Sequence, residues 1–483
     1  MSETAIIWFR RDLRLTDNPA LEQALASCEH VIPVYIHAPD EEAPWQLGGA
    51  SRWWLHHSLN ALAADIGALG SRLIIRRDDS LEALRLLIRE TGAKQCLWNR
   101  LYDPATIERD TTVKQALRAE GVRCDSFNAA MMQEPWQVKT GAGEPYRVFT
   151  PYWRRCLPQL AGIAAPPPTP KALPPVADSI ASLPVDTLAL LPNIRWDAGL
   201  YETWQPGEAG AAERLKTFLA GPITEYGEGR EVPGQPGTSA LSPHLHWGEI
   251  GPRQILHAIG DHGLSDNADA AHYIRELGWR DFSYQMLYHF PNTPTAPLNP
   301  KFAAFPWRDD ADGALLSAWQ RGTTGIPIVD AGMRELWQTG WMHNRVRMVV
   351  SSLLTKNLRL PWQEGARWFW DTLVDADLAS NTQGWQWSAG SGADAAPYFR
   401  IFNPVRQGER FDPNGVYVRR WCPELARLPD KLILQPWEAQ PALLEEFGLR
   451  LGRDYPAPVV DLKQSRAEAL AAYDSIKSAT PAG

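Results

Sequence analysis

Short β-branched runs alternate with helical patterns over the first 130 residues of the chain. The strand-like runs are "AIIWF" (5–9), "VIPVYI" (31–36), "RLIIRR" (72–77) and "QCLWN" (95–99). Between them, "NPALEQALAS", "WWLHHSLNALAADIGALG" and "LEALRLLIRETG" carry apolar residues at helical spacing and end near Gly. This alternation predicts an α/β domain with a doubly wound parallel sheet, covered by helices on both faces. No GxGxxG follows the first run, so an ordinary Rossmann dinucleotide site is not expected there.

A proline-rich stretch separates this region from the rest of the chain. Residues 161–186, "AGIAAPPPTPKALPPVADSIASLPVD", cannot sustain a helix or a sheet and are typical of a linker. From about residue 205 onward β-branched runs become scarce and helical patterns such as "AAERLKTFLAG" dominate. We therefore expect an α/β domain over residues 1–135, a Pro-rich interdomain linker over 136–204 and a large all-α domain over 205–475.

The composition is that of a globular protein. A chain of 483 residues with 44% hydrophobic and 22% charged residues suits two or three domains that bury a real core. The start "MSETAIIWFRRDLRL" has no apolar segment followed by a small-residue cleavage site, and no apolar run approaches the length of a membrane span. Secretion and membrane spanning are therefore not expected, and we expect a cytoplasmic protein.

The ionisable residues do not indicate a metal or a particular partner. The five cysteines are scattered without a CxxC pair, which is typical of buried or incidental thiols in a reducing compartment. "HLH" at 244–246 has no nearby carboxylate or thiol partner set, so no metal site is expected. The net charge of −8 does not indicate nucleic acid, although a local basic surface would be enough to bind it. The 22 tryptophans suit either a large aromatic core or a protein that binds planar rings or moves electrons.

Segment 237–250, "GTSALSPHLHWGEI", contains a strong helix start. Ser242 followed by Pro243 predicts a helix with Ser242 as N-cap and proline in the first position. Thr238 and Ser239 lie just before it, and a helix N-terminus with free N–H groups and hydroxyls suits a phosphate. Simple capping explains the segment equally well.

Segment 272–282, "HYIRELGWRDF", places polar and aromatic residues together. Tyr273, Glu276 and Arg280 fall on one face of a helix, and Trp279 also neighbours Glu276. A carboxylate among aromatic residues is either a surface salt-bridge former or a pocket residue. From this segment alone, the salt bridge is the better explanation.

Two more segments carry polar residues that a plain helical bundle does not need. In "GWMHNRVRMVVSS" (340–352), Asn344, Arg347 and Met348 share a face, which indicates a polar partner. The stretch 375–404, "DADLASNTQGWQWSAGSGADAAPYFRIFNP", resembles neither a helix nor a strand. Its first two carboxylates can accept hydrogen bonds from ribose hydroxyls or ring N–H groups, and the residues expected to pack around the bound group are Asn381, Gly384, Trp385 and Trp387.

Taken together, these segments closely resemble the photolyase/cryptochrome flavoproteins. The resemblance runs over nearly the whole chain, through "WFRRDLRLTDNPAL", "TGIPIVDAGMREL", "GWMHNRVRM", the stretch 375–404 and "PELARLP". "GGASRWWLHHSL" and "RVFTPYWR" look most like the bacterial class III branch, which repairs cyclobutane pyrimidine dimers. The resemblance implies a U-shaped FAD in the helical domain and an enzyme, a deoxyribodipyrimidine photo-lyase, that acts on UV-damaged DNA. An electron from the excited reduced flavin would split the flipped-out dimer and then return.

The resemblance also implies site residues for the flavin. Asn381 matches the position that faces flavin N5. Positions around the FAD phosphates, sugar and ring are matched by Tyr226, Thr238, Ser239, Ala240, Leu241, Ser242, Tyr273, Arg280, Arg347, Asp375, Ala376 and Asp377.

Further matches concern the lesion, the DNA and electron transfer. Glu276 and Asn344 match positions that hydrogen-bond the flipped bases, Trp279 would stack on them and Met348 would line the pocket. Arginine suits bidentate phosphate binding, and the DNA-contacting positions are matched by Arg230, Arg345, Arg400 and Gln407. The family's electron-transfer tryptophans are matched by Trp307, Trp362 and Trp385, with other routes through Trp319, Trp368 and Trp370.

The main alternative is a cryptochrome-like blue-light sensor without repair activity. Plant cryptochromes typically carry Asp and animal ones Cys where this chain has Asn381, which favours repair. The chain ends with "AYDSIKSATPAG", so no signalling tail is expected. Asn344 and Met348 favour cyclobutane dimers over pyrimidine–pyrimidone lesions. An electron-transfer flavoprotein without DNA would leave Arg230, Arg345 and Trp279 unexplained.

The antenna chromophore is the least defined part of the resemblance. Class I folate binders carry Asn and Glu where "YDPATIERD" has Ala105 and Thr106. Methenyltetrahydrofolate is therefore expected, ahead of a deazaflavin, in a differently built site near Arg52, Trp53 and Trp54. Equally, these aromatic residues could merely pack the first helix against the sheet. A monomer is the default expectation.

Overall fold

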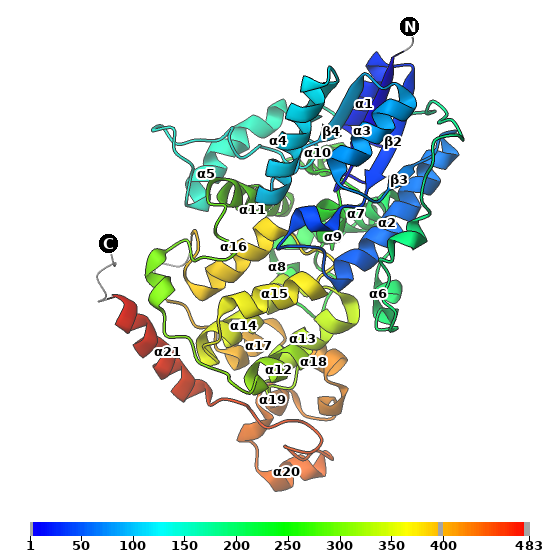
Figure 1. Ribbon diagram of the computed structural model, residues 1–483. Helices are drawn as coiled ribbons and strands as arrows, with labels where there is room; N and C mark the ends of the chain where they lie inside the picture. The colour runs from blue at the N-terminus through cyan, green and yellow to red at the C-terminus, as the bar shows by residue number, and fades with distance from the viewer. Residues whose placement is uncertain (1–2, 395–398, 478–483) are drawn as a thin grey trace. The chain divides into compact units, whose positions relative to one another are not determined.

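The computed structural model describes residues 3–394 and 399–477, and Figure 1 shows it as a ribbon. The chain forms two compact units, each built from separate segments. The first unit comprises Met1–Thr224, Ser239–Pro291 and Val374–Leu378, and the second comprises Glu225–Thr238, Asn292–Leu373 and Ala379–Gly483. Residues 395–398 of the stretch 375–404 and the expected end of the chain after 477 lie outside the described residues. The domain boundaries expected from the sequence stay a prediction.

A five-stranded parallel sheet forms the centre of the first unit. The strand order is β3-β2-β1-β4-β5, with β1 (Thr4–Phe9), β2 (His30–Ile36), β3 (Ile74–Arg76), β4 (Gln95–Asn99) and β5 (Arg123–Phe127). The α/β prediction and its four strands are confirmed. The sequence does not reveal β5, "RCDSF", because polar and charged residues make up most of this half-exposed edge strand.

Helices connect these strands and build most of the second unit. The α-helices of the first unit are α1 (Pro19–Ser27), α2 (Gly49–Ala68), α3 (Ser80–Thr91), α4 (Pro104–Ala119), α5 (Phe149–Cys156), α6 (Ala198–Thr203), α7 (Glu208–Leu219), α9 (Ser242–His246), α10 (Pro252–Asp261) and α11 (Ala268–His289). Those of the second unit are α8 (Tyr226–Gly229), α12 (Ala314–Arg321), α13 (Pro327–Thr339), α14 (Asn344–Ser352), α15 (Trp362–Thr372), α16 (Leu378–Ala389, whose first residue ends the first unit), α17 (Pro404–Phe411), α18 (Val416–Trp421), α19 (Asp430–Ile433), α20 (Pro441–Glu446) and α21 (Leu462–Lys477). Shorter helices are η1 (Pro39–Glu42), η2 (Leu157–Gly162), η3 (Val185–Leu188), η4 (Pro222–Glu225), η5 (Pro300–Ala304), η6 (Leu353–Asn357, a π-helix), η7 (Pro423–Leu425) and η8 (Pro436–Glu438).

Both faces of the sheet are buried. Ile6 and Trp8 of β1 pack in one hydrophobic cluster with residues of α3 and α4. The alternate β1 residues Ala5, Ile7 and Phe9 point to the other face and are also buried. Burial on both faces explains why β1 is a continuous apolar run.

The predicted linker covers the edge of the sheet at β3. Residues 163–184, all of which the structure describes, lie outside helices and strands. Leu183 N donates to Ile75 O (3.0 Å), and Ser182 Oγ accepts from Ile75 N (2.9 Å). Val176 of the same stretch joins the core cluster. An exposed strand edge can pair with other chains. This stretch therefore protects the edge of the sheet and also connects the segments before and after it.

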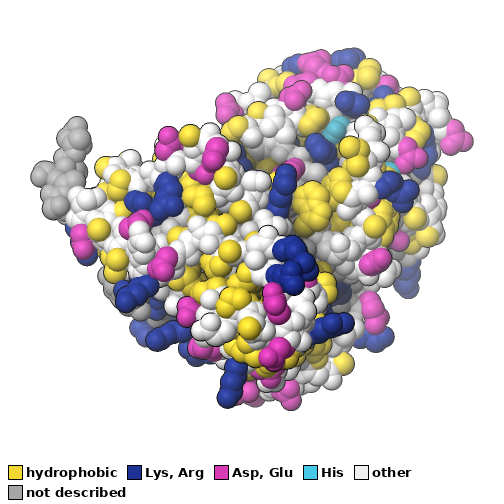
Figure 2. All heavy atoms as spheres, turned by 90° about the horizontal axis from the view of Figure 1, so that it is seen from below, with side chains coloured by type: hydrophobic (Ala, Val, Ile, Leu, Met, Phe, Trp, Pro, Cys, Tyr) yellow, Lys and Arg dark blue, Asp and Glu magenta, His cyan; other side chains and the backbone are white. Residues whose placement is uncertain are grey.

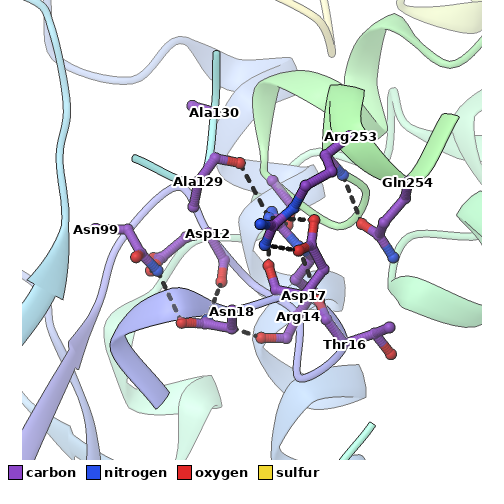
Figure 3. A network of polar contacts seen from close by, with 12 residues as sticks. Asp12, Arg14, Thr16, Asp17, Asn18, Asn99, Ala129, Ala130, Arg253 and Gln254 are labelled. Carbon is purple, nitrogen blue, oxygen red and sulfur yellow. Dashed lines mark hydrogen bonds and ion pairs between the residues drawn. The ribbon is translucent and has the colours of Figure 1, made fainter. Parts of the chain in front are cut away.

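The polar residues of "RRDLRLTDN" form a buried network after β1 (Figure 3). Asn99, at the end of β4, donates from Nδ2 to Asp12 Oδ2 (2.7 Å) and to Asn18 Oδ1 (2.8 Å). Arg14 Nη1 donates to Gly248 O (2.9 Å), in the segment before α10. The charged residues of this motif therefore anchor the loop after β1 and stabilise the fold.

The second unit packs its helices closely around small residues. A Cβ added at Gly332 of α13 would lie 2.3 Å from Val346 Cγ1 and 3.1 Å from Val350 Cγ1 of α14. Only glycine therefore permits this separation of α13 and α14 without a shift of one helix. The contact fixes α14, which carries several predicted site residues.

The stretch that begins at Asp375 contains a helix, which corrects the expectation of an irregular segment. α16 spans Leu378–Ala389 and includes Asn381 and Gly384, two residues of low helix propensity that hide it in the sequence. Tertiary packing overrides that propensity. The buried ring of Trp385 lies against Gly365 of α15, where an added Cβ would be 2.0 Å from Trp385 Cη2.

Candidate functional site

The segment before α9 holds a hydroxyl against α11. Tyr273 Oη donates to Ser239 Oγ (3.0 Å), which also accepts from Leu241 N (3.3 Å). The N-cap of α9 is Leu241, without a side-chain hydrogen bond, and Ser242 is the first helical residue. This corrects the prediction of Ser242 as N-cap, because Ser239 makes the local side-chain bond instead. Ala240 has φ of 49°, a left-handed conformation that is uncommon outside glycine and is found at ligand-binding turns.

Asp377 is held as an anion in the first unit. Tyr284 Oη of α11 donates to Asp377 Oδ2, and His246 Nδ1 of α9 lies 3.6 Å from the same oxygen. All three side chains are buried. Burial raises the pKa of this carboxyl, but the hydrogen bond and charge of His246, together with the charge of Arg280, outweigh burial and hold the pKa of Asp377 well below its usual range. A fixed anion of this kind can accept a hydrogen bond from a bound polar group.

Both histidines of "HLH" have carboxylate partners, contrary to the expectation from the local sequence. His244 Nδ1 lies 2.5 Å from Glu249 Oε2, and Glu249 Oε1 accepts from Trp54 Nε1 (3.0 Å). His246 meets Asp377, far along the chain, where sequence spacing gives no signal. The other ring nitrogen of His246, Nε2, is buried and makes no hydrogen bond within the described residues, so it is suited to a bound polar group.

The predicted antenna residues Arg52, Trp53 and Trp54 lie in α2. Arg52 is exposed, whereas Trp53 and Trp54 are buried. Trp53 packs edge-on against Tyr201 (5.2 Å between centroids), and Trp54 packs edge-on against Trp204 (5.4 Å). This packing within the first unit favours the structural explanation for the two tryptophans. Their part in binding an antenna stays a prediction.

Trp279 of α11 forms an aromatic platform. Its ring is stacked on Phe149 of α5, with centroids 3.7 Å apart and planes 11° apart. The guanidinium of Arg275 lies 5.5 Å from the centroid of Phe149. The ring of Trp279 is therefore held in one orientation, as a residue that stacks on a base requires.

Glu276 and Arg280 have partners in the same unit. His272 Nε2 lies 3.8 Å from Glu276 Oε1, one turn earlier on α11. Arg280 Nη1 donates to Ala130 O (2.5 Å), and the guanidinium lies 5.0 Å from the centroid of Tyr284. Arg280, a residue predicted from the resemblance, therefore lies beside Tyr284, which donates to the predicted carboxylate Asp377.

α14 presents the predicted polar residues of the second unit. Asn344 is its exposed first residue, and His343 caps the helix by accepting from Arg345 N at Nδ1 (3.2 Å). Arg347 Nε donates to a backbone carbonyl of the preceding loop (2.8 Å). Met348 is half-buried, and its Sδ lies 3.8 Å from Arg345 Nη1.

Two predicted DNA-contacting residues, Arg230 and Arg345, meet at Glu231. Arg345 Nη2 forms an ion pair with Glu231 Oε2, and Arg230 Nε lies 3.8 Å from Glu231 Oε1. The guanidinium of Arg345 lies 4.3 Å from the centroid of Phe411. Burial, followed by the charges of Arg345, Arg230 and Arg347, lowers the pKa of His343 to about 3.

Tyr226, Arg400 and Gln407 are further predicted residues of the second unit. Tyr226 begins α8, and its ring centroid lies 5.4 Å from the guanidinium of Arg230. The guanidinium of Arg400 lies 5.7 Å from the centroid of Phe402. Gln407 lies in α17, and its Oε1 is buried without a hydrogen bond within the described residues. Thr238 of the second unit is half-buried, and Asp375 and Ala376 of the first unit are buried.

Asn381 and Trp385 lie on α16. Asn381 Nδ2 donates to Ala366 O of α15 (3.0 Å), which leaves the amide oxygen to accept a hydrogen bond. Trp385 is 2% exposed and contacts Trp319 edge-on, with centroids 6.0 Å apart. Trp362, the first residue of α15, is equally buried, and Trp307 is half-buried. The ring contact to Trp319 supports the alternative route named from the sequence.

Sequence reasoning missed three residues of these clusters: Glu231, His246 and Tyr284. Glu231 directly follows Arg230, so the sequence signal for it was a negative charge next to a predicted DNA-contacting arginine. His246 and Tyr284 act through Asp377, a contact that only the folded chain reveals. Within the described ranges, the structure has no group of three or more His, Cys, Asp and Glu side chains that could hold a metal ion. Over the same ranges, no helix is both long and apolar enough to cross a membrane.

Known proteins resemble this chain over its whole length. The family model described as "DNA photolyase" matches residues 5–173, and that described as "FAD binding domain of DNA photolyase" matches residues 273–475. A deoxyribodipyrimidine photo-lyase of Agrobacterium fabrum is 48% identical over 482 residues, covering 98% of each chain. Cryptochrome-1 of Arabidopsis thaliana is 39% identical, covering 99% of this chain and 72% of its own. A crystal structure of a bacterial class III photolyase from Agrobacterium tumefaciens superposes with a TM-score of 0.93 at 46% identity, covering 99% of this chain and 98% of the other.

The sheet, the helical FAD-binding domain and these matches agree with one another. The chain belongs to the photolyase/cryptochrome family. In the first unit, the anionic Asp377 and the buried Nε2 of His246, which has no hydrogen bond within the described residues, suit polar groups of a cofactor such as a flavin. In the second unit, the amide oxygen of Asn381 offers an acceptor of its own.

Proposed function

We propose that this chain is a light-driven DNA repair enzyme that splits cyclobutane pyrimidine dimers, a deoxyribodipyrimidine photo-lyase. The observation that carries the proposal is the aromatic platform of Trp279 on Phe149, beside Glu276 on the same helix. A stacked ring next to a hydrogen-bonding carboxylate suits a pair of joined bases taken out of the helix. Whole-length similarity to a deoxyribodipyrimidine photo-lyase supports the same substrate class.

The proposed flavin residues come from the segments 238–242, 273–280 and 375–381, with Tyr226 and Arg347. Reduced FAD, when bound, supplies the electron that opens the cyclobutane ring. Asn381 offers its amide oxygen as a hydrogen-bond acceptor without adding a charge. The anionic Asp377 offers a second acceptor, for a ribose hydroxyl or a ring N–H group.

The lesion residues have separate roles. Trp279 would stack on the flipped bases, and Glu276 and Asn344 would hydrogen-bond their edges. Met348 would line the pocket with a polarizable thioether. The arginines Arg230, Arg345 and Arg400, with Gln407, would contact the phosphate backbone, which fixes the register of the DNA.

Tryptophans would return an oxidised flavin to its active reduced state. We assign this role to Trp385, Trp362 and Trp307, with a branch at Trp319. The edge contact between Trp385 and Trp319 supports that branch. An antenna chromophore, methenyltetrahydrofolate ahead of a deazaflavin, would absorb additional light. We further infer a monomer that works in the cytoplasm.

The direct test is repair by the purified protein. The flavin is photoreduced, an oligonucleotide with one thymine cyclobutane dimer is added, and restored thymines are quantified by chromatography under near-ultraviolet or blue light. Light-dependent restoration that is missing in the dark supports the proposal. If the flavin is bound and reduced and no thymine is restored, the proposal is wrong and a cryptochrome-like sensor becomes the better explanation.

A variant pair makes this test specific to the proposed platform. Trp279→Ala removes the ring that would stack on the bases. At limiting DNA concentration it is expected to reduce repair by about fivefold or more, since base stacking is worth about 1–3 kcal/mol. Tyr201→Ala removes an exposed aromatic residue from α6 and serves as the control. Equal repair by the two variants would contradict the role of Trp279.

A further inference from the structure

A carboxylate lies where a DNA phosphate is proposed to bind. Glu231 directly follows Arg230 and is partly exposed. Its Oε2 pairs with Arg345 Nη2 of α14, and its Oε1 lies 3.8 Å from Arg230 Nε. Because the two arginines are proposed phosphate contacts, the inference that follows rests on the proposed function.

The ion pair occupies Nη2 of Arg345, the nitrogen that belongs to both bidentate edges of the guanidinium. A guanidinium offers two bidentate edges, Nε with Nη2 and Nη1 with Nη2. Glu231 takes Nη2, whereas Nη1 lies 3.8 Å from Met348 Sδ and Nε has no hydrogen bond within the described residues. Glu231 therefore blocks both edges at once, although the other two nitrogens are not committed to oxygen acceptors.

The surroundings of Arg345 otherwise favour an anion from outside. α14 begins at Asn344, so its positive helix end adds to the charges of Arg345 and Arg347. The low pKa of His343 reflects burial and then the charges of these arginines. The stacking of Arg345 over Phe411 also limits the positions of its guanidinium. A bound phosphate would therefore meet Arg345 close to its present position, where Glu231 now lies.

We propose that Glu231 is an intramolecular competitor of the DNA phosphate. In the free protein it neutralises Arg345, and DNA binding requires its release. A phosphate is present in damaged and undamaged DNA alike, so Glu231 weakens binding to both by the same factor. It thereby limits nonspecific binding to the large excess of undamaged DNA without changing the preference for the lesion.

The test is Glu231→Gln, which keeps the shape of the side chain and removes its charge. Binding is measured by fluorescence anisotropy on one short duplex, undamaged or with a single thymine dimer, over a series of salt concentrations. We expect affinity to rise about two- to fivefold on both duplexes, the range that partly exposed ion pairs are worth. The ratio of the two affinities should stay unchanged, and the salt dependence should steepen by up to about one unit of slope.

Two controls separate competition from other effects. Glu228→Gln removes the same charge from an exposed side chain of the same segment and should leave both affinities unchanged. In an Arg345→Ala background, Glu231→Gln should lose most of its effect, because the atom that it competes for is missing. A gain of equal size in that background would overturn the proposal.

The outcomes also separate this inference from the proposed function. Weaker DNA binding by Glu231→Gln would mean that the carboxylate orients Arg345 for the phosphate, and unchanged binding would mean that it does not compete; either result overturns the inference while repair by the parent protein stands. Tighter binding without light-dependent repair in the parent protein would support the inference and overturn the proposed reaction. A parent protein and variant that both fail to bind DNA would overturn both.

Discussion

The side-chain amide of Asn381 has one donor atom and one acceptor atom, and the donor is already used. Its Nδ2 donates to Ala366 O, so the oxygen is the atom that would meet the flavin in the proposed site. An amide oxygen accepts a hydrogen bond from N5–H, whereas a carboxylic acid in the same place exchanges a proton and a carboxylate adds a negative charge. The residue at position 381 thus decides whether the environment tolerates or destabilises the reduced flavin anion.

Asn381→Asp should therefore reduce repair. A carboxylate beside the reduced flavin destabilises its anion, and a penalty of about 1.4 kcal/mol already corresponds to a tenfold slower reaction. Initial repair rates of dimer-containing oligonucleotide are compared at equal flavin content, which is read from absorbance. Ser380→Asp places the same charge on the exposed neighbouring position of α16 and should repair at the parent rate. Repair by Asn381→Asp at the parent rate would remove residue 381 as the feature that separates repair from sensing.

At the scale of elements, contacts between helices decide where the site residues lie. Trp385 of α16 fits only because Gly365 of α15 leaves room for its ring, and α14 approaches α13 at Gly332. These glycines interrupt good helical patterns in the sequence. They are explained by the neighbouring helix and not by the helix that contains them.

Gly365→Ala should displace Trp385. The added Cβ would lie 2.0 Å from the ring, so the helices must separate at a cost of about 1–3 kcal/mol. Gly67→Ala, in α2 and outside the proposed site, is the matched control, because nothing lies within 4 Å of its added Cβ. That change should stabilise the protein by about 0.5–1 kcal/mol, as expected for alanine in place of glycine within a helix. Chemical denaturation measures both changes, and photoreduction of bound flavin should slow only in Gly365→Ala.

The junction of α13, α14 and α18 contains a buried carboxyl that responds to pH. Tyr417 Oη of α18 donates to Glu335 Oε2 of α13 (2.6 Å), and His343 N donates to the same oxygen (3.3 Å). Burial raises the pKa of Glu335 to about 7, although Tyr417, His343 N and the charges of Arg347 and Arg420 act in the opposite direction. The folded protein therefore binds a proton at Glu335 more tightly than the unfolded chain does.

Glu335→Gln should flatten part of the pH dependence of stability. The raised pKa of Glu335 gives stability that is fully present below its ordinary value of 4.5 and is lost as pH rises through about 7. Glutamine does not ionise, so the variant should gain on the parent by roughly 2–3 kcal/mol between pH 4.5 and 8. Unfolding free energies from denaturant titrations at several pH values measure this gain. Glu446→Gln, at an exposed position of α20, should show none.

Sequence patterns revealed the elements whose burial is periodic and local. β1 and β4 are buried on both faces and read as apolar runs, whereas β5 and α16 did not stand out, because an edge strand is polar and α16 depends on the fit of Trp385 against α15. For the site, resemblance supplied candidate residues, whose roles stay predictions. It could not supply Glu231 or His246, because their roles come from Arg345 and Asp377, which are remote in sequence and near in space.

At the scale of the whole molecule, the protein and its proposed DNA partner both carry a net negative charge. The chain carries a net charge of −8, and acidic and basic side chains are intermixed over the face in Figure 2. Binding to DNA must then depend on where particular arginines lie and not on the total charge. Removing one positive charge should matter at a phosphate-contacting position and should be nearly silent elsewhere.

Arg400→Ala and Arg195→Ala test this dependence, because both remove one charge from an exposed arginine. Arg400 is a proposed phosphate contact, and Arg195 lies near the end of the predicted linker, outside the proposed site. Each lost phosphate contact reduces the slope of log affinity against log salt concentration by about one and weakens binding to all sequences equally. We therefore expect Arg400→Ala to lower affinity and slope together, measured by anisotropy on an undamaged duplex. Arg195→Ala should retain the slope of the parent. Equal losses in the two variants would mean that the total charge governs binding, and the local arginine surface would have to be abandoned.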